Sequence, residues 1–397
     1  MTAALSNIRV LDLGTFIAGP YCATLLGEFG AEVIKIEPTE GGDALRKFGT
    51  ETDCGDTLVW LSESRNKKCV TLNLRTSRGI ELLKGLIAQA DVVVENFRPG
   101  VMEKWGLGWE KIHEINPRTV MVRISAYGQT GPYRLQPGFA RVAHAFSGLA
   151  FLAGQPGEVP VVPGSTSLAD YMSGAYGAMG AMVALHARQA SGLGQCVDLG
   201  LYEPVFRVLD EIAPAFQQNG FVRQRMGADT VNVCPHSHYQ TRDGKWIAIA
   251  CSNDKIFERL ATAMGQPELA GADRFGPKEK RLAARAQVNG IVADWVASID
   301  CAEALKRCEE AGTPASLIFS IADIFEDPQY LARENIRMIN SRIGPVAVPG
   351  VVPKLSATPG EINWLGEGLG SRNEEVLGGL LGIGAEELMA LQEQGII

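Results

Sequence analysis

The sequence lacks several patterns by which common protein classes are recognised. Its eight cysteines form no Cys-x-x-Cys pair and no zinc-type spacing, which fits a reducing, cytoplasmic location better than a disulfide framework. The most apolar long stretch, residues 168–185, is rich in glycine and alanine and contains Asp170. We therefore expect a buried helix there and not a membrane span. The first nine residues contain no basic region followed by an apolar core, so we expect no signal peptide.

Positive charge, histidine and nucleotide-binding motifs are also scarce. The net charge of -8 argues against a general nucleic-acid binder, although a local basic patch can still hold a phosphate group. Of five histidines, His236 and His238 lie near Cys234 without a third ligand, so we expect no metal site. No phosphate-binding loop of the ATP or NAD type follows the first expected strand. Gly-x-Ser-x-Gly is absent as well.

What the sequence does contain is an alternation of short apolar runs with helical patterns. The expected strands are residues 8–13, 32–37, 70–74, 91–95 and 120–125, and the expected helices between them include 20–29 and 77–89. Such alternation predicts an α/β fold with a parallel sheet and helices on both faces. Ligands of such sheets bind beyond the carboxyl ends of the strands, here in the loops 14–20, 38–43 and 96–100.

The pattern changes near residue 225. Residues 141–190 are expected to be helical and 195–199 to form a strand. A short strand at 246–250 and helical patterns at 254–264, 281–298 and 302–312 then follow, with an extended segment at 345–353 and a last helical stretch at 374–393. Because no flexible linker separates the two parts, the smaller one is predicted to be an insertion. We expect a large domain from 1–220, a small α/β domain from 225–325, and a C-terminal part, 326–397, that returns to the large domain.

Asp170 is the most interesting acidic residue. It follows a glycine-rich segment and lies in the first turn of the expected helix. Ser167-x-x-Asp170 is typical of a capping box, in which the acid only stabilises the helix terminus. A helix N-terminus also keeps a carboxylate ionised at neutral pH, and an ionised carboxylate can attack a thioester while backbone N–H groups hold the oxyanion. The residues alone leave both interpretations open.

Basic residues gather around two of the expected loops. Arg65, Lys67 and Lys68 precede the third strand, and Arg98 and Lys104 flank the loop that follows the fourth. A pyrophosphate is expected at such a loop. A solvated surface is the alternative for any one of these side chains.

Taken together, the motifs resemble the class III CoA transferases, the family of formyl-CoA transferase and carnitine CoA transferase. The resemblance extends along nearly the whole chain. It includes Ala18-Gly19-Pro20, residues 29–37, Gly42-Asp43, Asn66-Lys67-Lys68, residues 95–100 and 127–132, the segment with Asp170, Gly192-x-Gly194-Gln195, and residues 326–329. It implies a large Rossmann-like parallel-sheet domain with a smaller inserted α/β domain, and homodimers whose subunits interlock like chain links.

The resemblance also implies a chemistry. Asp170 attacks an acyl-CoA thioester, forms a mixed anhydride and releases CoA thiolate. The anhydride then passes to an aspartyl-CoA thioester or directly to the acceptor acid, which conserves the thioester energy. The partners are therefore an acyl-CoA and a small carboxylic acid, with no tightly bound cofactor, no nucleic acid and no membrane.

Further residues are assigned by the same resemblance. Lys104 faces the CoA phosphates, and Asn96 and Arg98 line the same channel. Asn73 and Lys68 lie near the nucleotide, and Trp105 is placed in the CoA site with them. Ile17 replaces a glutamine that the formyl-CoA enzyme has near its active site, and Tyr127 is a candidate substrate contact.

The acceptor acid is expected to be a di- or hydroxydicarboxylate such as malate, citramalate, mesaconate or itaconate, with succinyl-CoA or another dicarboxylyl-CoA as donor. Its second carboxylate needs a cation, for which Arg46 and Arg141 are candidates. For Arg141, an ordinary position on a helix surface is the alternative.

Two other functions compete. The 2-methylacyl-CoA racemases resemble the same sequence, but they need a histidine opposite the aspartate for proton transfer. That position is Phe139 here, and His144 is too far along the chain to be the same group. The second is a non-catalytic partner subunit of a transferase, against which an intact Asp170 argues.

Overall fold

A computed structural model describes residues 3–397 of the chain, except for the side chain of Ser165. Contacts along the backbone divide the chain into two compact units. The first unit comprises Met1–Leu149, Gly164–Ile212 and Gln329–Ile397; the second comprises Ala150–Pro163 and Ala213–Pro328. The chain therefore leaves the first unit twice and returns to it each time.

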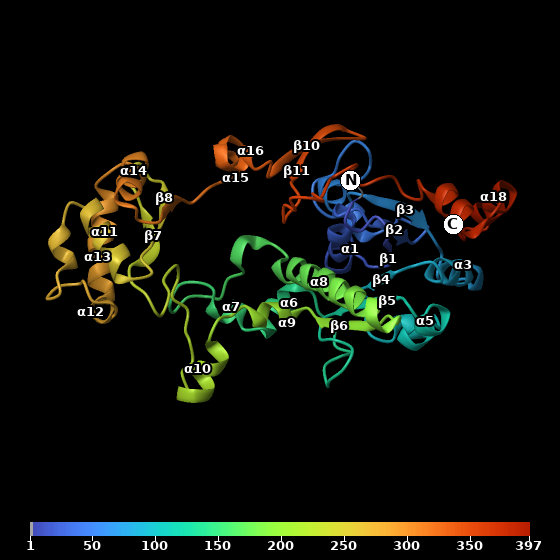
Figure 1. Cartoon of the computed structure of the whole chain (residues 1–397), viewed down its shortest axis with the longest axis horizontal. Helices are drawn as coiled ribbons and strands as arrows, with labels where there is room; N and C mark the ends of the chain where they lie inside the picture. Colours follow the sequence, from blue (N-terminus) through green and yellow to red (C-terminus); the bar gives the residue numbers. More distant parts are fainter. Residues whose placement is uncertain (1–2) are drawn as a thin grey trace. The chain divides into compact units, whose positions relative to one another are not determined.

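The first unit contains a six-stranded parallel sheet (Figure 1). Its strands are β1 (Arg9–Asp12), β2 (Glu32–Glu37), β3 (Lys67–Thr71), β4 (Val92–Glu95), β5 (Val120–Ser125) and β6 (Cys196–Gly200). They lie in the order β3-β2-β1-β4-β5-β6 with every neighbouring pair parallel. The predicted α/β class with a parallel sheet is thus confirmed. The order reverses between β1 and β4, and such a switch point is where doubly wound sheets bind ligands.

Helices occupy both sides of this sheet. Those of the first unit are α1 (Ala18–Glu28), α2 (Leu58–Glu63), α3 (Ser77–Ile87), α4 (Val101–Lys104), α5 (Trp109–Ile115), α6 (Ala140–Phe146), α8 (Leu168–Ser191), α9 (Tyr202–Arg207), α17 (Gly379–Leu381) and α18 (Ala385–Glu393). Two helices cross the boundary between the units: α7 (Leu149–Leu152) has only its first residue in the first unit, and α16 (Pro328–Ala332) has all but its first residue there. Short turns η1 (Ala44–Lys47), η2 (Pro163–Ser165) and η4 (Glu374–Gly378) complete it, with an antiparallel hairpin of β10 (Ile336–Ser341) and β11 (Gly344–Pro349).

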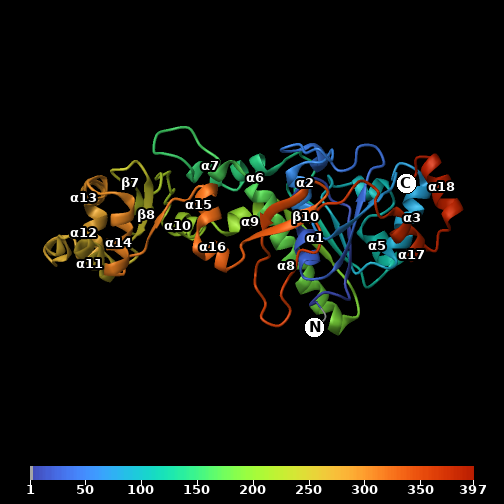
Figure 2. The same cartoon turned by 90° about the horizontal axis from the view of Figure 1, so that it is seen from above.

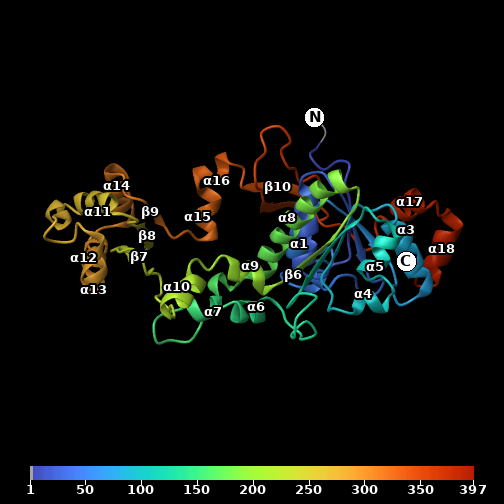
Figure 3. The same ribbon diagram turned by 60° about the horizontal axis from the view of Figure 1, so that its bottom comes forward.

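Two hydrophobic cores cover the two faces of the sheet. Helices α1 and α8 pack on one face, and α3, α5 and α18 pack on the other (Figure 3). Because successive strand residues point to opposite faces, Val10 joins the first core and its neighbour Leu11 the second. Helices α1 and α8 approach closely at Gly174, where a Cβ atom would lie 2.8 Å from the carbonyl oxygen of Ala18. This contact holds the start of α8 near the loop that follows β1.

Two predictions about this unit were inaccurate. The third strand was expected at 70–74 but spans Lys67–Thr71, because Lys67 is wholly buried and its charge is paired inside the sheet with Asp12. The helix expected over 141–190 is broken into α6, α7 and α8. The intervening segment 153–167 contains several glycines and prolines, which do not continue a helix.

The second unit has its own small sheet and core. Strands β7 (His236–Gln240), β8 (Trp246–Ala250) and β9 (Ala315–Leu317) form an antiparallel sheet. Its helices are α10 (Ile212–Asn219, whose first residue belongs to the first unit), α11 (Asp254–Ala263), α12 (Lys278–Ala283), α13 (Arg285–Ala297), α14 (Cys301–Ala311) and α15 (Ile321–Glu326), with the turn η3 (Pro267–Ala270). Figure 2 shows α11–α14 gathered beside β7 and β8. The expected helix at 281–298 is two helices, α12 and α13. Among the helices described in the chain, none has the length and apolarity needed to cross a bilayer.

Candidate active site

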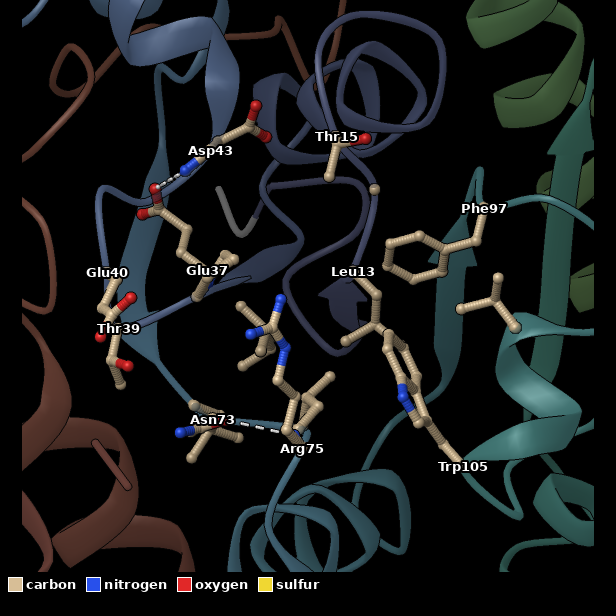
Figure 4. Close-up of a pocket in the computed structure, with 16 residues that line it drawn as sticks. Leu13, Thr15, Glu37, Thr39, Glu40, Asp43, Asn73, Arg75, Phe97 and Trp105 are labelled. Carbon is tan, nitrogen blue, oxygen red and sulfur yellow. Dashed lines mark hydrogen bonds between the residues drawn. The ribbon is translucent and has the colours of Figure 1, made fainter. Parts of the chain in front are cut away.

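A cavity of the first unit lies beyond the carboxyl ends of four neighbouring strands. We call it the switch-point cavity; its volume is about 400 Å³. It is lined by residues 13–15 after β1, 36–40 at the end of β2, 72–75 after β3, and Phe97, Val101 and Trp105 after β4, with Asp43 at its edge. In Figure 4 the Arg75 side chain extends into the space between Glu40 and Trp105. The lining therefore holds one cation, Arg75, together with three carboxylates, Glu37, Glu40 and Asp43, among mostly apolar residues.

A second, smaller cavity contains the predicted catalytic acid. We call it the Asp170 cavity; its volume is about 80 Å³. Its walls are residues 15–18, Asn96, residues 124–126 and 138–139, Asp170 and Leu201. Thr15 lines both cavities. A ligand that spans the two would therefore pass the loop that follows β1.

That loop is held by side chains from other strands. The amide of Asn96 accepts a hydrogen bond from the backbone N–H of Thr15 at 2.7 Å and donates one to the Thr15 carbonyl at 2.9 Å. The carboxylate of Asp43 accepts from the N–H of Phe16 at 3.0 Å, and Phe16 has a φ of 59°, a left-handed conformation that is uncommon for a bulky residue. The loop is therefore fixed in a conformation that its own residues do not favour.

The Asp43 carboxylate is itself kept charged by a buried lysine. Its Oδ2 lies 2.7 Å from Lys35 Nζ, and neither side chain is significantly exposed. Burial alone would raise the pKa of Asp43, but the Lys35 charge and the N–H donors of Leu45 and Phe16 lower it below the usual value. Asp43 thus remains an ionised acceptor that can anchor the loop.

Asp170 lies in the first turn of α8, as predicted, but its pKa is shifted upward and not downward. Burial raises the pKa of Asp170 to about 6, whereas a helix N-terminus alone was expected to favour the charged form. The capping-box interpretation is wrong, since the Ser167 side chain accepts no capping hydrogen bond. Within the described part of the chain, the Asp170 carboxylate has no hydrogen-bond partner. It is therefore still mostly ionised at neutral pH and is free to react.

Sequence reasoning missed the residue that occupies the capping position. His144 of α6 accepts a hydrogen bond at Nε2 from the backbone N–H of Ala169, at 3.0 Å. It is 1% exposed. Helix α6 begins after Phe139, a wall of the Asp170 cavity. No local pattern identifies this contact, because the two residues are 25 positions apart.

The basic cluster expected before the third strand does not form an open patch. Lys67 lies 2.9 Å from Asp12 with no exposed side-chain area, and Arg65 lies 3.5 Å from Glu28, also buried. Lys68 is near the amino end of β3, away from the cavity, and pairs with acidic side chains at 2.7 Å, those of Glu32 and Glu375. Burying Lys67 and Arg65 requires such partners. The structure thus argues against a role for Lys68 in the CoA site.

The residues predicted for the CoA site are only partly brought together. Asn73 and Trp105 line the switch-point cavity, whereas Asn96 lines the Asp170 cavity. Arg98 and Lys104 are exposed and lie outside both linings.

Arg75 was missed, although it lines the switch-point cavity. The cause is the position of β3. A strand expected at 70–74 leaves its last residue next to Arg75, whereas a strand ending at Thr71 makes residues 72–75 a loop at its carboxyl end. Corrected strand bounds would have identified this arginine.

Arg46 contradicts its predicted role. Its guanidinium is 4% exposed, bonds to Glu37 at 2.6 Å and to Asp56 at 2.9 Å, and stacks on the ring of Trp60 at 3.7 Å. All its donors face the protein interior, so it cannot hold a substrate carboxylate.

The other predicted substrate contacts lie on or near the Asp170 cavity. Ile17 is buried in its wall. Tyr127 follows the wall residue Ala126 and packs against an aromatic group formed by Tyr133, Phe146 and Tyr202. Arg141 is exposed near the start of α6, two residues after Phe139. In the residues described, no group of three or more His, Cys, Asp or Glu side chains is arranged to hold a metal ion.

Comparisons with known proteins identify the family of the chain. The sequence matches the family described as CoA-transferase family III over residues 5–372. It is 53% identical over 399 residues to the succinyl-CoA–L-malate CoA-transferase beta subunit of Chloroflexus aurantiacus, covering 100% of this chain and 98% of that protein. It is 42% identical over 394 residues to the succinyl-CoA–D-citramalate CoA-transferase of the same organism, covering 99% and 98%. A crystal structure of a CAIB/BAIF family protein from Brucella suis matches with a TM-score of 0.84 and 30% identity, covering 96% of this chain and 100% of that one.

Proposed function

Since the chain belongs to CoA-transferase family III, we propose that this enzyme moves CoA from succinyl-CoA, or another dicarboxylyl-CoA, to a hydroxydicarboxylate such as malate or citramalate. Relatives named for succinyl-CoA with malate and with citramalate support this choice of substrates. The observation that carries the proposal is that Thr15 lines both cavities, with the half-buried carboxylate of Asp170 in the smaller one. A long thioester reaches from one to the other.

The switch-point cavity takes the nucleotide part of CoA. Arg75 supplies the positive charge for a phosphate group, Asn73 supplies polar atoms, and Trp105 supplies an apolar wall. Arg98 and Lys104 directly adjoin the wall residues Phe97 and Trp105 in sequence, so they add positive charge at the rim. CoA is a substrate here and not a resident cofactor.

The Asp170 carboxylate is the nucleophile. One oxygen forms a bond to the thioester carbonyl carbon, the carbon–sulfur bond breaks, and CoA leaves as thiolate with the bonding electron pair. The thiolate then attacks the aspartyl carbonyl of the mixed anhydride, which releases succinate and forms an aspartyl-CoA thioester. The acceptor carboxylate repeats the two steps in reverse order, so the product thioester leaves and Asp170 is regenerated. A carboxylate with a pKa of about 6 is ionised at neutral pH and poorly solvated, which suits this role.

Phe139 supports transfer over the racemase alternative. It lies in the wall of the Asp170 cavity, at the position where the racemases resembled by this sequence have their proton-transferring histidine. A phenyl ring cannot accept or return a proton. The acid in this cavity is therefore proposed to act alone, as a nucleophile.

We further propose that the first unit is the large domain and the second unit the small domain of an interlocked, cytoplasmic homodimer. The relative named a beta subunit suggests the alternative that two unlike chains pair. The purified chain distinguishes the two: a homodimer transfers CoA by itself, whereas a partner subunit gains activity only when a second protein is added.

Trapping the intermediate tests the reaction. The purified chain is incubated with succinyl-CoA, treated with hydroxylamine or borohydride, and mapped by peptide mass. Modification of the peptide containing Asp170, and its absence from the Asp170→Ala variant, is the expected result. Modification confined to other peptides would contradict the mechanism. A screen of acceptor acids against succinyl-CoA then identifies the second substrate.

A further inference from the structure

Helix α8 begins without a cap from its own sequence. Its N-cap residue, Ser167, makes no side-chain hydrogen bond to the first turn, although serine commonly does so at this position. The N–H of Ala169, two residues further on, donates instead to Nε2 of His144 at 3.0 Å. A histidine from another helix thus takes the place that a local capping residue normally occupies.

This hydrogen bond defines the state of the imidazole. A backbone N–H can only donate, so Nε2 of His144 must be unprotonated and the single ring proton must be on Nδ1. Burial, and then the charge of Arg141 on the same helix, lower the pKa of His144 below its usual value. The ring is therefore neutral at physiological pH, as the bond requires. Nδ1 is buried and has no partner among the described residues.

We propose that His144 is a positioning residue for Asp170, because it satisfies the helix N–H group for which the Asp170 carboxylate would otherwise compete. Asp170 follows Ala169 directly and stands at a helix position where an acid readily accepts backbone N–H bonds. With His144 as the cap, the carboxylate is left unpaired and faces the cavity. The inference deepens the proposed function, on which its activity readout rests.

The same contact joins two walls of the Asp170 cavity. His144 is on α6, which begins directly after the wall residue Phe139, and Asp170 is on α8. The groups nearest in sequence that can affect the titration are Arg141 on α6 and Tyr171 on α8, whose own pKa burial raises. Burial is what raises the pKa of Asp170, so a change in its hydrogen bonding shows directly in that pKa.

Two substitutions test the role. His144→Leu removes the acceptor at similar size. We expect kcat to fall about 10-fold to 100-fold with little change in KM for succinyl-CoA, the loss typical of a misplaced group. The acidic limb of the kcat profile should also move to lower pH, because Asp170 now accepts the free helix N–H and such bonds lower a carboxyl pKa.

His144→Gln puts an amide oxygen where Nε2 was. It should therefore retain most of the wild-type kcat, and the acidic limb of its pH profile should lie at the wild-type pH. His186→Leu, an exposed histidine on α8 itself, is the matched control and should behave as wild type. A His144→Leu variant with unchanged kcat and an unchanged acidic limb would overturn the proposal. Equal loss in the Leu and Gln variants, with no movement of the limb, would also overturn it, since that pattern indicates packing alone.

A direct measurement separates this inference from the proposed reaction. With imidazole nitrogens labelled by ¹⁵N, and His144 assigned by its absence in His144→Gln, the neutral tautomer with its proton on Nδ1 is expected at neutral pH. A proton on Nε2 would contradict the cap, whether or not the leucine variant folds. If the wild type transfers no CoA although the tautomer is as expected, the proposed function fails and the capping contact stands.

Discussion

The side chain of Asn96 and the backbone of Thr15 form a two-bond pair, with the amide accepting at 2.7 Å and donating at 2.9 Å. Asn96 follows β4 and Thr15 follows β1, so the pair closes the gap at which the strand order reverses. Thr15 lines both cavities. The pair therefore fixes the point over which a bound thioester would pass.

Asn96→Ala should weaken both binding and turnover. Loss of the two bonds leaves the Thr15 N–H and carbonyl without these partners, and we expect kcat/KM for succinyl-CoA to fall about 10-fold to 100-fold. Asn116→Ala is the matched control. Asn116 also donates its amide to backbone carbonyls, including that of Ala90 at 3.1 Å, but it lines neither cavity. A similar loss of kcat/KM in both variants would show that the effect is not specific to the loop after β1.

Arg46→Met is expected to destabilise the fold and not to raise KM for any acid. The substitution leaves the buried carboxylates of Glu37 and Asp56 without their shared cation. Breaking a buried pair in this way costs about 3–5 kcal/mol. Urea unfolding measures the loss, and Arg78→Met, at an exposed ion pair of the same unit, should lose at most about 1 kcal/mol. A stable Arg46→Met enzyme with a raised KM only for dicarboxylates would restore the substrate role that the structure argues against.

Asp170→Asn should abolish transfer and raise the free energy of unfolding near neutral pH. The folded pKa of about 6 exceeds the ordinary value of 3.8 for an aspartate, so burying the charged form costs roughly 2–3 kcal/mol, which the neutral amide avoids. Because the folded pKa is raised, the wild type recovers this stability as the pH falls through about 6 toward 4. The advantage of the variant should therefore be full above about pH 7 and vanish near pH 4. Asp53→Asn, at an exposed site, should show no such pH-dependent gain, and a gain equal at both pH values would contradict the desolvation argument.

The sheet was largely predictable because its strands are apolar runs bounded by glycine and proline. Five of the six strands, β1, β2, β4, β5 and β6, begin and end within about a residue of the expected bounds. The exception is β3, which begins with Lys67. The charge of Lys67 is paired with the carboxylate of Asp12 on β1, and β1 is not next to β3 in the sequence or in the sheet. Hydrophobic periodicity cannot detect a buried cation, because the compensating charge is brought by the fold.

The site was predictable only where one residue carried the signal. Asp170 could be singled out from its place in a helical turn, but its raised pKa follows from burial, which no local pattern shows. Arg46 looked like any arginine of a ligand loop, and its two buried partners are fixed by tertiary structure. The sequence excludes His144 only as the proton-transferring histidine of a racemase. Its actual contact is with the backbone of Ala169. A contact to a backbone group 25 positions away leaves no trace in residue types.

Arg75→Gln should raise KM for succinyl-CoA about tenfold while kcat stays nearly constant. The side chain extends into the switch-point cavity, far along the chain from the reacting carboxylate (Figure 4), and a charge-assisted bond to phosphate that is made equally in ground and transition states affects KM alone. Raising the ionic strength should reduce the difference between variant and wild type. Lys84→Gln, on the adjoining helix α3 but outside the cavity, is the control. A fall in kcat with unchanged KM would place Arg75 in the chemical step instead.

Arg141 remains the candidate for the distal carboxylate of the acceptor. It is exposed on α6 two residues from Phe139, a wall of the Asp170 cavity. Arg141→Ala should therefore raise KM for malate about tenfold, the loss of a charge-assisted pair, and leave KM for a monocarboxylic acceptor unchanged. Arg141→Lys keeps the charge but not the planar guanidinium, so its KM for malate should lie between those of the wild type and of Arg141→Ala. Because the Arg141 charge also lowers the pKa of His144, the alanine variant should make that imidazole easier to protonate and so lose turnover at a higher pH than the lysine variant does. An unchanged KM for every dicarboxylate tested would reduce Arg141 to an ordinary surface residue and leave the second carboxylate to be held by another group.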